Sequence, residues 1–578
     1  MTVLYWLLIP VLGFLVGFAL DYVFLVKYPA EIPTIRYSRG FWSHVRSNIG
    51  YFTSQKRWIR DGYNEYNKKG LPFLVPSGFS RPYDVVLPRT MLTWLRDQPE
   101  SVVDARLAHN VSAYGDYNFL DSEIIRSPFG MRAVQKSMNR SLPGLVSAMD
   151  KEVQHAVDLA LKDVGNDWTS INLWGMWQAI VLFVTNRMLV GSTLCRDERF
   201  LNAMVSFTHA VMRNCVLLRF VPLILHPILG RMLAISNWVH WRRAYCRVGP
   251  VIKTRIDSMS RKAKGDPELQ NWSPPEDYIT WLVRLALEEN RDQELDPIVI
   301  SKRLLPIEFA AIDTTVITGV LWIQDLLKTP SAVEDLTAEL RAHQPAPGES
   351  WSAKALQSLL QVDSSIRESQ RLSNFHLTLV ERVVVASDGL CLPGLGWKIP
   401  KGAHLTVNAD GSHHDGDLYH DPYTYDALRF STMRKERGEH HNASNDAAKP
   451  LGMVTMNDHH FPFGHGKHAC PGRFFVAHEM KLIAAHLLLN FDLKMEDSTS
   501  NRLWVGPGMM PPFGGRIKAE NPAAVPTAEP DEEPPGVYKI PGQQTLKIDE
   551  ILGLRYSPDI CRWGQHPPGR TVFESADH

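Results

Sequence analysis

The chain has 578 residues, of which 44% are hydrophobic, and its 62 basic and 62 acidic side chains balance to a formal net charge of zero. This length fits either three or four domains or one large catalytic domain built from long helices. The hydrophobic fraction is enough for a sizeable core. The balanced charge argues against a nucleic-acid-binding protein, which usually has a basic excess or stripe.

The N-terminus has the composition of a membrane anchor. Residues 3–20 carry no charge, and after Asp21 the apolar run continues over residues 22–26. A helix of about 20 apolar residues crosses a bilayer. Basic residues follow this run but do not precede it, which predicts a cytoplasmic location for the rest of the chain: Lys27, Arg36 and Arg39. We expect a single-pass transmembrane anchor at 1–27. The alternative, a cleaved signal peptide, would need a basic start and a small-residue cleavage site.

The rest of the chain divides by composition. Pro29 and Pro33 predict a stiff hinge over 28–34. Residues 35–518 alternate helical periodicity with short strand patterns, which predicts a mainly α fold with a small β lobe. Helices are expected at 168–189, 298–328, 352–372 and 472–490, and strands at 379–386 and 404–408. Residues 519–536 are acidic and proline-rich, as in a disordered linker, and lead to a C-terminal tail at 537–578 without an assigned role.

A second apolar segment lies in the middle of the chain. Residues 217–233 read LLRFVPLILHPILGRML and are interrupted by Pro222 and Pro227. Two prolines make this segment a poor soluble helix. We expect a patch that dips into the membrane, and the alternative is a loop packed between helices.

Cys470 lies in a setting that suits a thiolate ligand. The six cysteines are far apart and lack CxxC spacing, which argues against a disulfide framework or a structural zinc site. Around Cys470 the chain reads FPFGHGKHACPGRFF, so Gly464 and Gly466 allow a tight turn with positive φ. A long helix is expected directly after this turn, and its N-terminal dipole stabilises a thiolate. A thiolate ligand pushes electron density toward a heme iron and favours O–O cleavage.

The pattern Phe463-x-x-Gly-x-x-x-Cys470-x-Gly resembles the cytochrome P450 family over residues 35–518. The resemblance implies that heme b (iron protoporphyrin IX) is bound with Cys470 as the axial ligand of its iron. It also implies that Phe463 packs beside this ligand and that His468 reaches a heme propionate.

Two further segments strengthen the resemblance. Glu368-Ser-Gln-Arg371 resembles the family's Glu-x-x-Arg helix, in which the i,i+3 spacing lets the two side chains pair. The third member of this structural network is expected to be Arg429, although the surrounding Ala-Leu-Arg-Phe departs from the usual Pro-Glu-Arg-Phe. The alternative reading of Glu368 and Arg371 is a surface ion pair.

Ala310-Ala-Ile-Asp-Thr314 resembles the family's oxygen-activation motif, with Ala311 in the usual glycine position. Oxygen activation needs protons, which Asp313 and Thr314 can relay through water in a helix that is locally widened over the heme. These two residues are the expected catalytic pair. The alternative is that the hydroxyl only bonds the backbone of its own helix.

The resemblance also suggests cofactor contacts and partners. Arg382 and Lys136 occupy positions that resemble the family's propionate-binding residues, although Arg132 stands where the Lys136 helix usually has Trp. The expected electron donor is NADPH–cytochrome P450 reductase, with cytochrome b5 as a further donor. Basic residues near Cys470 are expected to form the docking face for the donor: Lys467, Arg473 and Lys481.

Together these features predict a monooxygenase in the endoplasmic reticulum membrane that inserts one oxygen atom from O₂ into a lipophilic small molecule. By analogy the substrate is a terpenoid or other secondary metabolite. Two alternatives remain open: a peroxide isomerase or dehydratase of the same fold that needs no reductase, and a non-catalytic heme-binding membrane protein.

Overall fold

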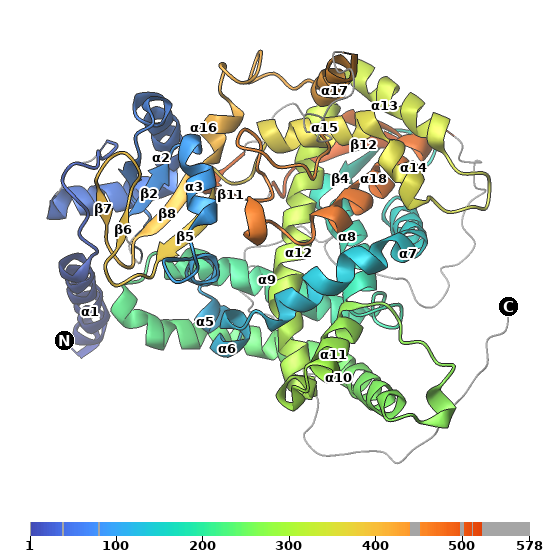
Figure 1. The fold of residues 1–578 in the computed structure, drawn as a ribbon, viewed down its shortest axis with the longest axis horizontal. Coiled ribbons are helices and arrows are strands. Elements are labelled where there is room, and N and C mark those ends of the chain that lie inside the picture. Colours follow the sequence, from blue (N-terminus) through green and yellow to red (C-terminus); the bar gives the residue numbers. More distant parts are fainter. Residues whose placement is uncertain are drawn as a thin grey trace.

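The computed structural model describes residues 2–36, 40–78, 81, 83–439, 451–496, 502–510 and 512–522, and within these ranges the side chains of residues 2–11 and 437–439 are not described. The acidic, proline-rich segment from residue 523 and the C-terminal tail therefore lie outside the described residues. The fold is mainly α-helical, with a β-rich lobe on one side (Figure 1).

Long helices form most of the molecule. They are α1 (Thr2–Phe24), α2 (Phe41–Glu65), α7 (Phe129–Ala160), α8 (Leu173–Leu189), α9 (Glu198–Leu218), α10 (His226–Ala263), α11 (Tyr278–Glu288), α12 (Pro297–Leu326), α13 (Pro330–His343), α15 (Leu360–Leu372), α17 (Arg429–Glu439) and α18 (Arg473–Asn490). The short helices are α3 (Leu92–Asp97), α4 (Ala105–Ser112), α5 (Gly115–Asn118), α6 (Ser122–Arg126), α14 (Ala353–Ser358) and α16 (Ala409–His413).

The β lobe is built on a five-stranded sheet in the order β1-β2-β8-β5-β3. Its strands are β1 (Phe73–Val75), β2 (Asp84–Leu87), β8 (His404–Asn408), β5 (Thr378–Val384) and β3 (Val103–Asp104), and only β2 and β8 pair in parallel. A three-stranded sheet joins β4 (Thr169–Asn172), β12 (Arg516–Glu520) and β9 (Asp492–Met495). Two hairpins complete the set: β6 (Leu390–Cys391) with β7 (Lys398–Ile399), and β10 (Trp504–Val505) with β11 (Gly508–Met509).

Helix α12 runs through the middle of the molecule and organises the core (Figure 1). Asp296 caps its start by accepting the Ile298 N–H at 2.8 Å, and Pro297 follows at the first helical position. Gly319 lets α12 approach α8 closely, because a Cβ there would lie 2.3 Å from the Trp177 ring. The helix is α-helical along its whole length, so the widened turn expected over the heme is not found in it.

Several expected boundaries shift in the structure. The helix expected at 168–189 begins as strand β4, and the one expected at 352–372 divides into α14 and α15. β12 continues to Glu520, two residues beyond the expected end of the domain, because it pairs with both β4 and β9. The strand expected at 404–408 is β8 with the same ends.

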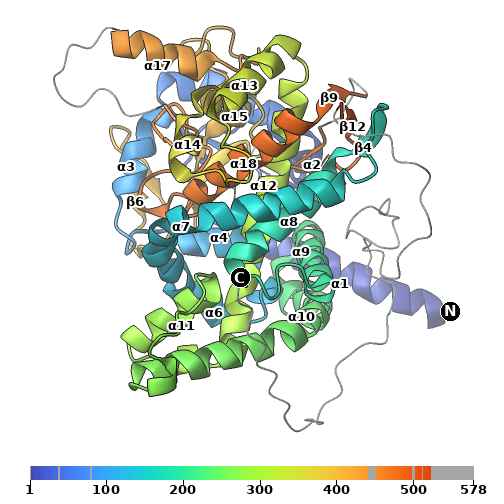
Figure 2. The same ribbon diagram turned by 90° about the vertical axis from the view of Figure 1, so that its right-hand side faces the viewer.

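Two apolar segments that are distant in sequence lie together. The short 3₁₀ turn η3 (Leu223–Leu225) packs against α1, and α10 begins just after it (Figure 2). Asp21 of α1 accepts the Leu223 N–H at 2.7 Å. The segment at 217–233 is therefore the end of α9, a turn and the start of α10, with Pro227 inside the first turn of α10.

Candidate active site

The loop before α18 forms the tight turn that its glycines predict. Gly464 and Gly466 have φ angles of 73° and 71°, in the region that favours glycine. The Cys470 N–H donates to the Phe463 carbonyl oxygen at 2.8 Å, which closes the loop. The Phe463 side chain packs against the main hydrophobic core.

The Cys470 thiol lies at the N-terminus of α18. Its pKa is raised by burial, and this shift is opposed by the backbone N–H groups of Gly472 and Arg473 and by the Arg473 charge. The N–H groups that interact with the sulfur thus come from the start of α18, in agreement with the expected effect of a helix N-terminus. Of the described cysteines, Cys195, Cys215, Cys391 and Cys470 are free thiols, whereas Cys246 is disulfide-bonded, so one cysteine departs from the expectation of isolated thiols. A partly accessible thiol at a helix N-terminus suits coordination of a metal as thiolate.

A stripe of accessible residues interrupts the buried surface of α12. Ala310 and Thr314, one turn apart, are exposed, whereas Ile312, Asp313 and Thr315 between and beside them are buried. Small and hydroxyl side chains on this stripe leave room for a flat group against the helix. The Thr314 hydroxyl donates to the Ala310 carbonyl oxygen at 2.5 Å, so the helix-internal bond that was the alternative expectation is present.

Asp313 faces the opposite direction, into the protein. It is 4% exposed, and neither carboxylate oxygen has a hydrogen-bond partner within the described residues. Burial raises its pKa to about 7, and a weaker interaction with the Thr208 hydroxyl opposes this shift. Asp313 can therefore hold or release a proton near neutral pH, but its side chain does not share the accessible stripe with Thr314.

A group of polar side chains gathers where β5 approaches the Cys470 loop. Buried Arg382 donates to the Glu381 carbonyl oxygen at 2.8 Å, and His468 Nε2 lies 3.5 Å from Glu100 Oε1. Burial and the Arg382 charge lower the pKa of His468 to about 4. Neutral His468 and cationic Arg382 can both donate to carboxylates, as heme propionates require.

His109 of α4 belongs to the same group and was missed from the sequence. Burial lowers its pKa, and the charges of Glu381 and Arg382 act on it. The ring side chain is nevertheless exposed, so it faces open space inside the fold. No motif marks this residue, and only the packing of α4 against β5 brings it here.

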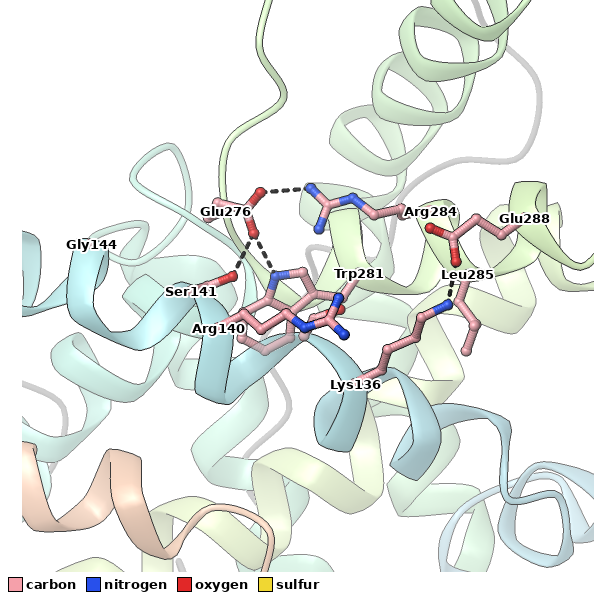
Figure 3. Close-up of a pocket in the computed structure, with 10 residues that line it drawn as sticks. Lys136, Arg140, Ser141, Gly144, Glu276, Trp281, Arg284, Leu285 and Glu288 are labelled. Atoms are coloured by element: carbon pink, nitrogen blue, oxygen red, sulfur yellow. Dashed lines mark hydrogen bonds and ion pairs between the residues drawn. The ribbon is translucent and has the colours of Figure 1, made fainter.

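Lys136 lies elsewhere. Its ammonium pairs with Glu288 of α11 at 2.5 Å, in a surface groove of about 420 Å³ between α7 and α11 (Figure 3). Glu276 holds the other end of the groove, where it accepts hydrogen bonds from Ser141, Trp281 and Arg284. Among the described contacts of Lys136 there is none with Arg382 or His468, so the structure does not bring it to the expected propionate group.

Glu368, Arg371 and Arg429 form the expected network. Arg371 is bidentate to Glu368, with both N–O distances 2.8 Å, and Arg429 Nε donates to Glu368 Oε1 at 2.9 Å. Glu368 and Arg371 are completely buried, which excludes the surface ion pair. Arg371 also donates to the carbonyl oxygens of His413 and Pro422, so the network ties α15 to the segment before the Cys470 loop.

The three basic residues expected on one docking face have different environments. Lys481 is buried and pairs with Asp363 at 2.7 Å, so it is not available to a partner protein. Lys467 is exposed beside Glu100, at 3.3 Å. Arg473 donates to the Cys470 carbonyl oxygen at 2.8 Å. The expected basic face is thus reduced to Lys467 and Arg473.

The donor set fits heme. The thiol at a helix start suits an axial ligand of the iron, and the accessible Ala–Thr stripe on α12 suits a flat macrocycle. The Arg–His group at the edge suits the two carboxylates of the macrocycle. This arrangement is typical of a heme-thiolate protein.

Comparison with known proteins agrees with this class. A family model described as Cytochrome P450 matches residues 129–514. Similar proteins include cytochrome P450 monooxygenase gloP of Glarea lozoyensis, 32% identical over 80% of this chain and 86% of the relative. Cytochrome P450 monooxygenase paxP of Penicillium paxilli is 29% identical over 86% of this chain and 92% of the relative. The chain belongs to the cytochrome P450 family and, as an enzyme, is a heme-thiolate monooxygenase.

A solved structure supports the fold independently. Retinoic acid bound cyanobacterial CYP120A1 is similar with a TM-score of 0.58, covering 86% of this chain and 100% of that one. At 19% sequence identity, this likeness bears on the fold alone.

Proposed function

We propose that the chain is a membrane-anchored monooxygenase that receives electrons from NADPH through a reductase and oxidises a lipophilic small molecule, such as a terpenoid or other secondary metabolite. The single observation that carries the proposal is the position of Cys470, a free, partly accessible thiol at the start of α18. The similarity of the chain to fungal monooxygenases supports the same monooxygenase reaction.

The cofactor would be heme b, with Cys470 as axial ligand and Phe463 beside it. When bound, heme b supplies the reductive activation of dioxygen, which puts one oxygen atom into a C–H bond and releases the other as water. Arg382, His468 and His109 would hold the two propionates by charge and hydrogen bonds.

Asp313 and Thr314 would supply protons for this chemistry. The Thr314 hydroxyl is exposed on α12 and can accept a hydrogen bond from water while it donates to the Ala310 carbonyl oxygen. Asp313 is the nearest acid in sequence, and a pKa of about 7 allows it to exchange protons with water during turnover. Because Asp313 faces away from Thr314, the relay requires an intervening water or a side-chain rotation.

The proposed site of action is the endoplasmic reticulum membrane, with the catalytic domain in the cytoplasm. By length and composition, the helix in the described part of the chain that could cross a membrane is α12, but 61% of its apolar window is buried as core. The part of α1 whose side chains are described contributes a shorter apolar helix, Leu12–Phe24. Support for the anchor is therefore the apolar composition of residues 3–26 together with the exposed apolar side chains around η3.

The proposed electron donors are NADPH–cytochrome P450 reductase and cytochrome b5. Lys467 supports an electrostatic contact with an acidic donor near the Cys470 loop, because its ammonium is exposed. Arg473 would contribute less, since it already bonds the Cys470 carbonyl oxygen.

The test is the optical difference spectrum of the dithionite-reduced protein with and without carbon monoxide. We expect a strongly red-shifted Soret band that is lost in Cys470→Ala, with Cys391→Ala as the control because Cys391 is an exposed free thiol. A band typical of histidine ligation, or an unchanged band in Cys470→Ala, would refute the proposal.

A further inference from the structure

Strand β5 carries an unusual backbone feature next to a charged residue. Val380 has a φ of 61°, which is rare for a β-branched side chain. The pairing of β5 with β8 shifts register between Leu379 and Arg382. Bulges of this kind re-aim side chains beside active sites, and here the re-aimed residue is Glu381.

Glu381 is held as an ionised acceptor. The Ser112 hydroxyl at the end of α4 donates to Glu381 Oε2 at 2.6 Å, and Arg81 donates to the same hydroxyl at 3.2 Å. Although burial alone would raise it, the pKa of Glu381 is lowered to about 2, mainly by the Arg81 charge and also by the Ser112 hydrogen bond. The other oxygen, Oε1, accepts no hydrogen bond from the described residues.

Two donors from other elements interact electrostatically with this carboxylate: Arg219 and His376. Arg219, directly after α9, donates one N–H to the Tyr51 hydroxyl, and its remaining N–H groups have no partner among the described residues. Burial lowers the pKa of Arg219, and the nearby Glu381 carboxylate opposes that shift. A Cβ on Gly506 would lie 2.2 Å from the Tyr51 hydroxyl that binds Arg219, and a Cβ on Gly508 would lie 3.8 Å from His376 Cε1, so Arg219 and His376 lie at the same β10–β11 hairpin. Arg219 and Glu381 carry opposite charges that act on each other.

His376 completes the group from the segment before β5. Its ring is exposed, yet burial by surrounding protein lowers its pKa, so the ring faces an interior space. Neither ring nitrogen has a hydrogen-bond partner in the described part of the chain, and the backbone bridges to Gly508 of β11. The charges of Glu381, Arg219 and His109 all act on His376, which joins this group to the propionate-binding group.

We propose that Glu381, Arg219 and His376 form a polar subsite that binds a hydroxyl group on an otherwise apolar substrate. The proposal rests on the proposed monooxygenase function and narrows its substrate class. A hydroxyl can donate to Glu381 Oε1 and accept from Arg219 or His376 at once. A substrate carboxylate would meet the Glu381 charge and a substrate cation the Arg219 charge, so the balanced pair selects against both.

The test uses the holoenzyme and four probes that share one fifteen-carbon skeleton: farnesol, farnesene, farnesoic acid and farnesyltrimethylammonium, whose quaternary nitrogen cannot bind iron. Affinity is measured from the Soret shift on titration. We expect wild type to bind farnesol about tenfold more tightly than farnesene, the size of effect that one or two hydrogen bonds provide.

Charge-changing variants separate recognition from a structural role. In Glu381→Gln the preference for farnesol over farnesene should fall to about threefold or less. The affinity for farnesoic acid relative to farnesyltrimethylammonium should rise about tenfold, because the negative charge of Glu381 is removed. Arg219→Met should shift the charge preference in the opposite direction. Glu496→Gln, at the end of β9, is the matched control and should leave every ratio unchanged.

The outcomes distinguish this proposal from the proposed function. The carbon monoxide spectrum of each variant reports whether the heme-thiolate site is intact. With an intact spectrum, equal responses to alcohol and hydrocarbon in wild type, including no response to either, would overturn the subsite. The same conclusion follows if both variants weaken all four probes by one factor, because a structural role changes affinity without changing preference.

Discussion

Two threonines on α12 make the same helix-internal bond but face different surroundings. Thr314 donates to the Ala310 carbonyl oxygen at 2.5 Å, and Thr318 donates to the Thr314 carbonyl oxygen at 2.8 Å. Replacing either by Ala removes one such bond, so the cost to the helix is similar. Thr314 alone lies on the exposed stripe beside Ala310, since Thr318 is half-buried.

We therefore expect Thr314→Ala to lower the product formed per NADPH by about tenfold or more, as loss of proton delivery does, and Thr318→Ala by less than about twofold. The measurement is product against NADPH consumed, with reductase and the first compound found to turn over. Equal losses in the two variants would show that the Thr314 hydroxyl serves only the helix.

The residues that could be predicted from sequence are those whose partners are local or whose spacing is distinctive. Cys470 and the Glu368–Arg371 pair depend on a turn, a helix start and i,i+3 geometry, which a single segment determines. Lys136 and Lys481 were misplaced because their partners, Glu288 and Asp363, come from distant helices. His109 and Glu381 could not be found, since only the packing of α4 against β5 gives them a role.

At the scale of elements, α8 bridges two buried carboxyl groups on different helices. Asn186 donates to Glu308 of α12 at 3.4 Å, and Thr185 donates to Glu479 of α18 at 3.2 Å. Both glutamates are completely buried, and burial raises the pKa of each from 4.5 to about 8. Between pH 4.5 and about 8 the folded chain keeps the protons of these two groups, whereas the unfolded chain releases them. The contribution of the two groups to the free energy of unfolding is therefore fully present below pH 4.5 and is lost as the pH rises toward 8.

We expect Glu308→Gln and Glu479→Gln each to flatten this dependence by up to about 1.4 kcal/mol per pH unit, because the amide keeps the shape without the proton. The urea midpoint for loss of the Soret band, followed from pH 5 to 8, measures it. Glu334→Gln, exposed on α13, should keep the wild-type slope. A wild-type slope in the first two variants would mean that both carboxyl groups are ionised in the folded protein.

A small residue lets α1 pack against η3. A Cβ on Gly17 would lie 2.9 Å from Ile224 Cγ2 and 3.1 Å from Pro222, whereas one on Gly13 would meet nothing within 4 Å. Gly17→Leu should therefore separate α1 from η3 and break the Asp21–Leu223 hydrogen bond, whereas Gly13→Leu should not. Proteolysis between α9 and α10 should be at least about threefold faster in membrane-bound Gly17→Leu than in Gly13→Leu, because the freed turn opens more often. Equal cleavage rates would show that the contact does not hold η3.

Element boundaries were less predictable than element types. The apolar periodicity of α8 and α12 is local, and both were found, as was β8. Strand β4 was missed because Thr169–Asn172 has no strand pattern of its own and is ordered by pairing with β12, about 350 residues away. The break between α14 and α15 was also missed, since Glu339 of α13 caps the start of α15 from outside the segment.

For the whole molecule, many of the exposed apolar side chains belong to α1 and to the elements next to it, whose ribbons are drawn in Figure 2. They belong to α1, the turn η3 and the first part of α10: Leu12, Leu15, Val16, Val23, Phe24, Leu223, Ile224, Ile228, Met232 and Ile235. A group of exposed apolar side chains on neighbouring elements indicates contact with a membrane or another protein. Because α1 and η3 are in contact, insertion of α1 would bring η3 to the same bilayer surface.

Removal of residues 1–27 should consequently weaken membrane binding without abolishing it. In vesicle flotation we expect the truncated holoenzyme to bind partially, because the side chains of η3 and α10 still bury apolar area in the interface. Adding Leu223→Glu and Ile224→Glu should lower the remaining partition by about tenfold or more, since two apolar side chains and their transfer free energy are lost. Leu503→Glu, at a side chain that is more exposed than either and lies just before β10, should have no such effect. If truncation alone abolishes flotation, α1 is the whole membrane contact; if the η3 substitutions and Leu503→Glu act alike, the binding surface lies elsewhere on the domain.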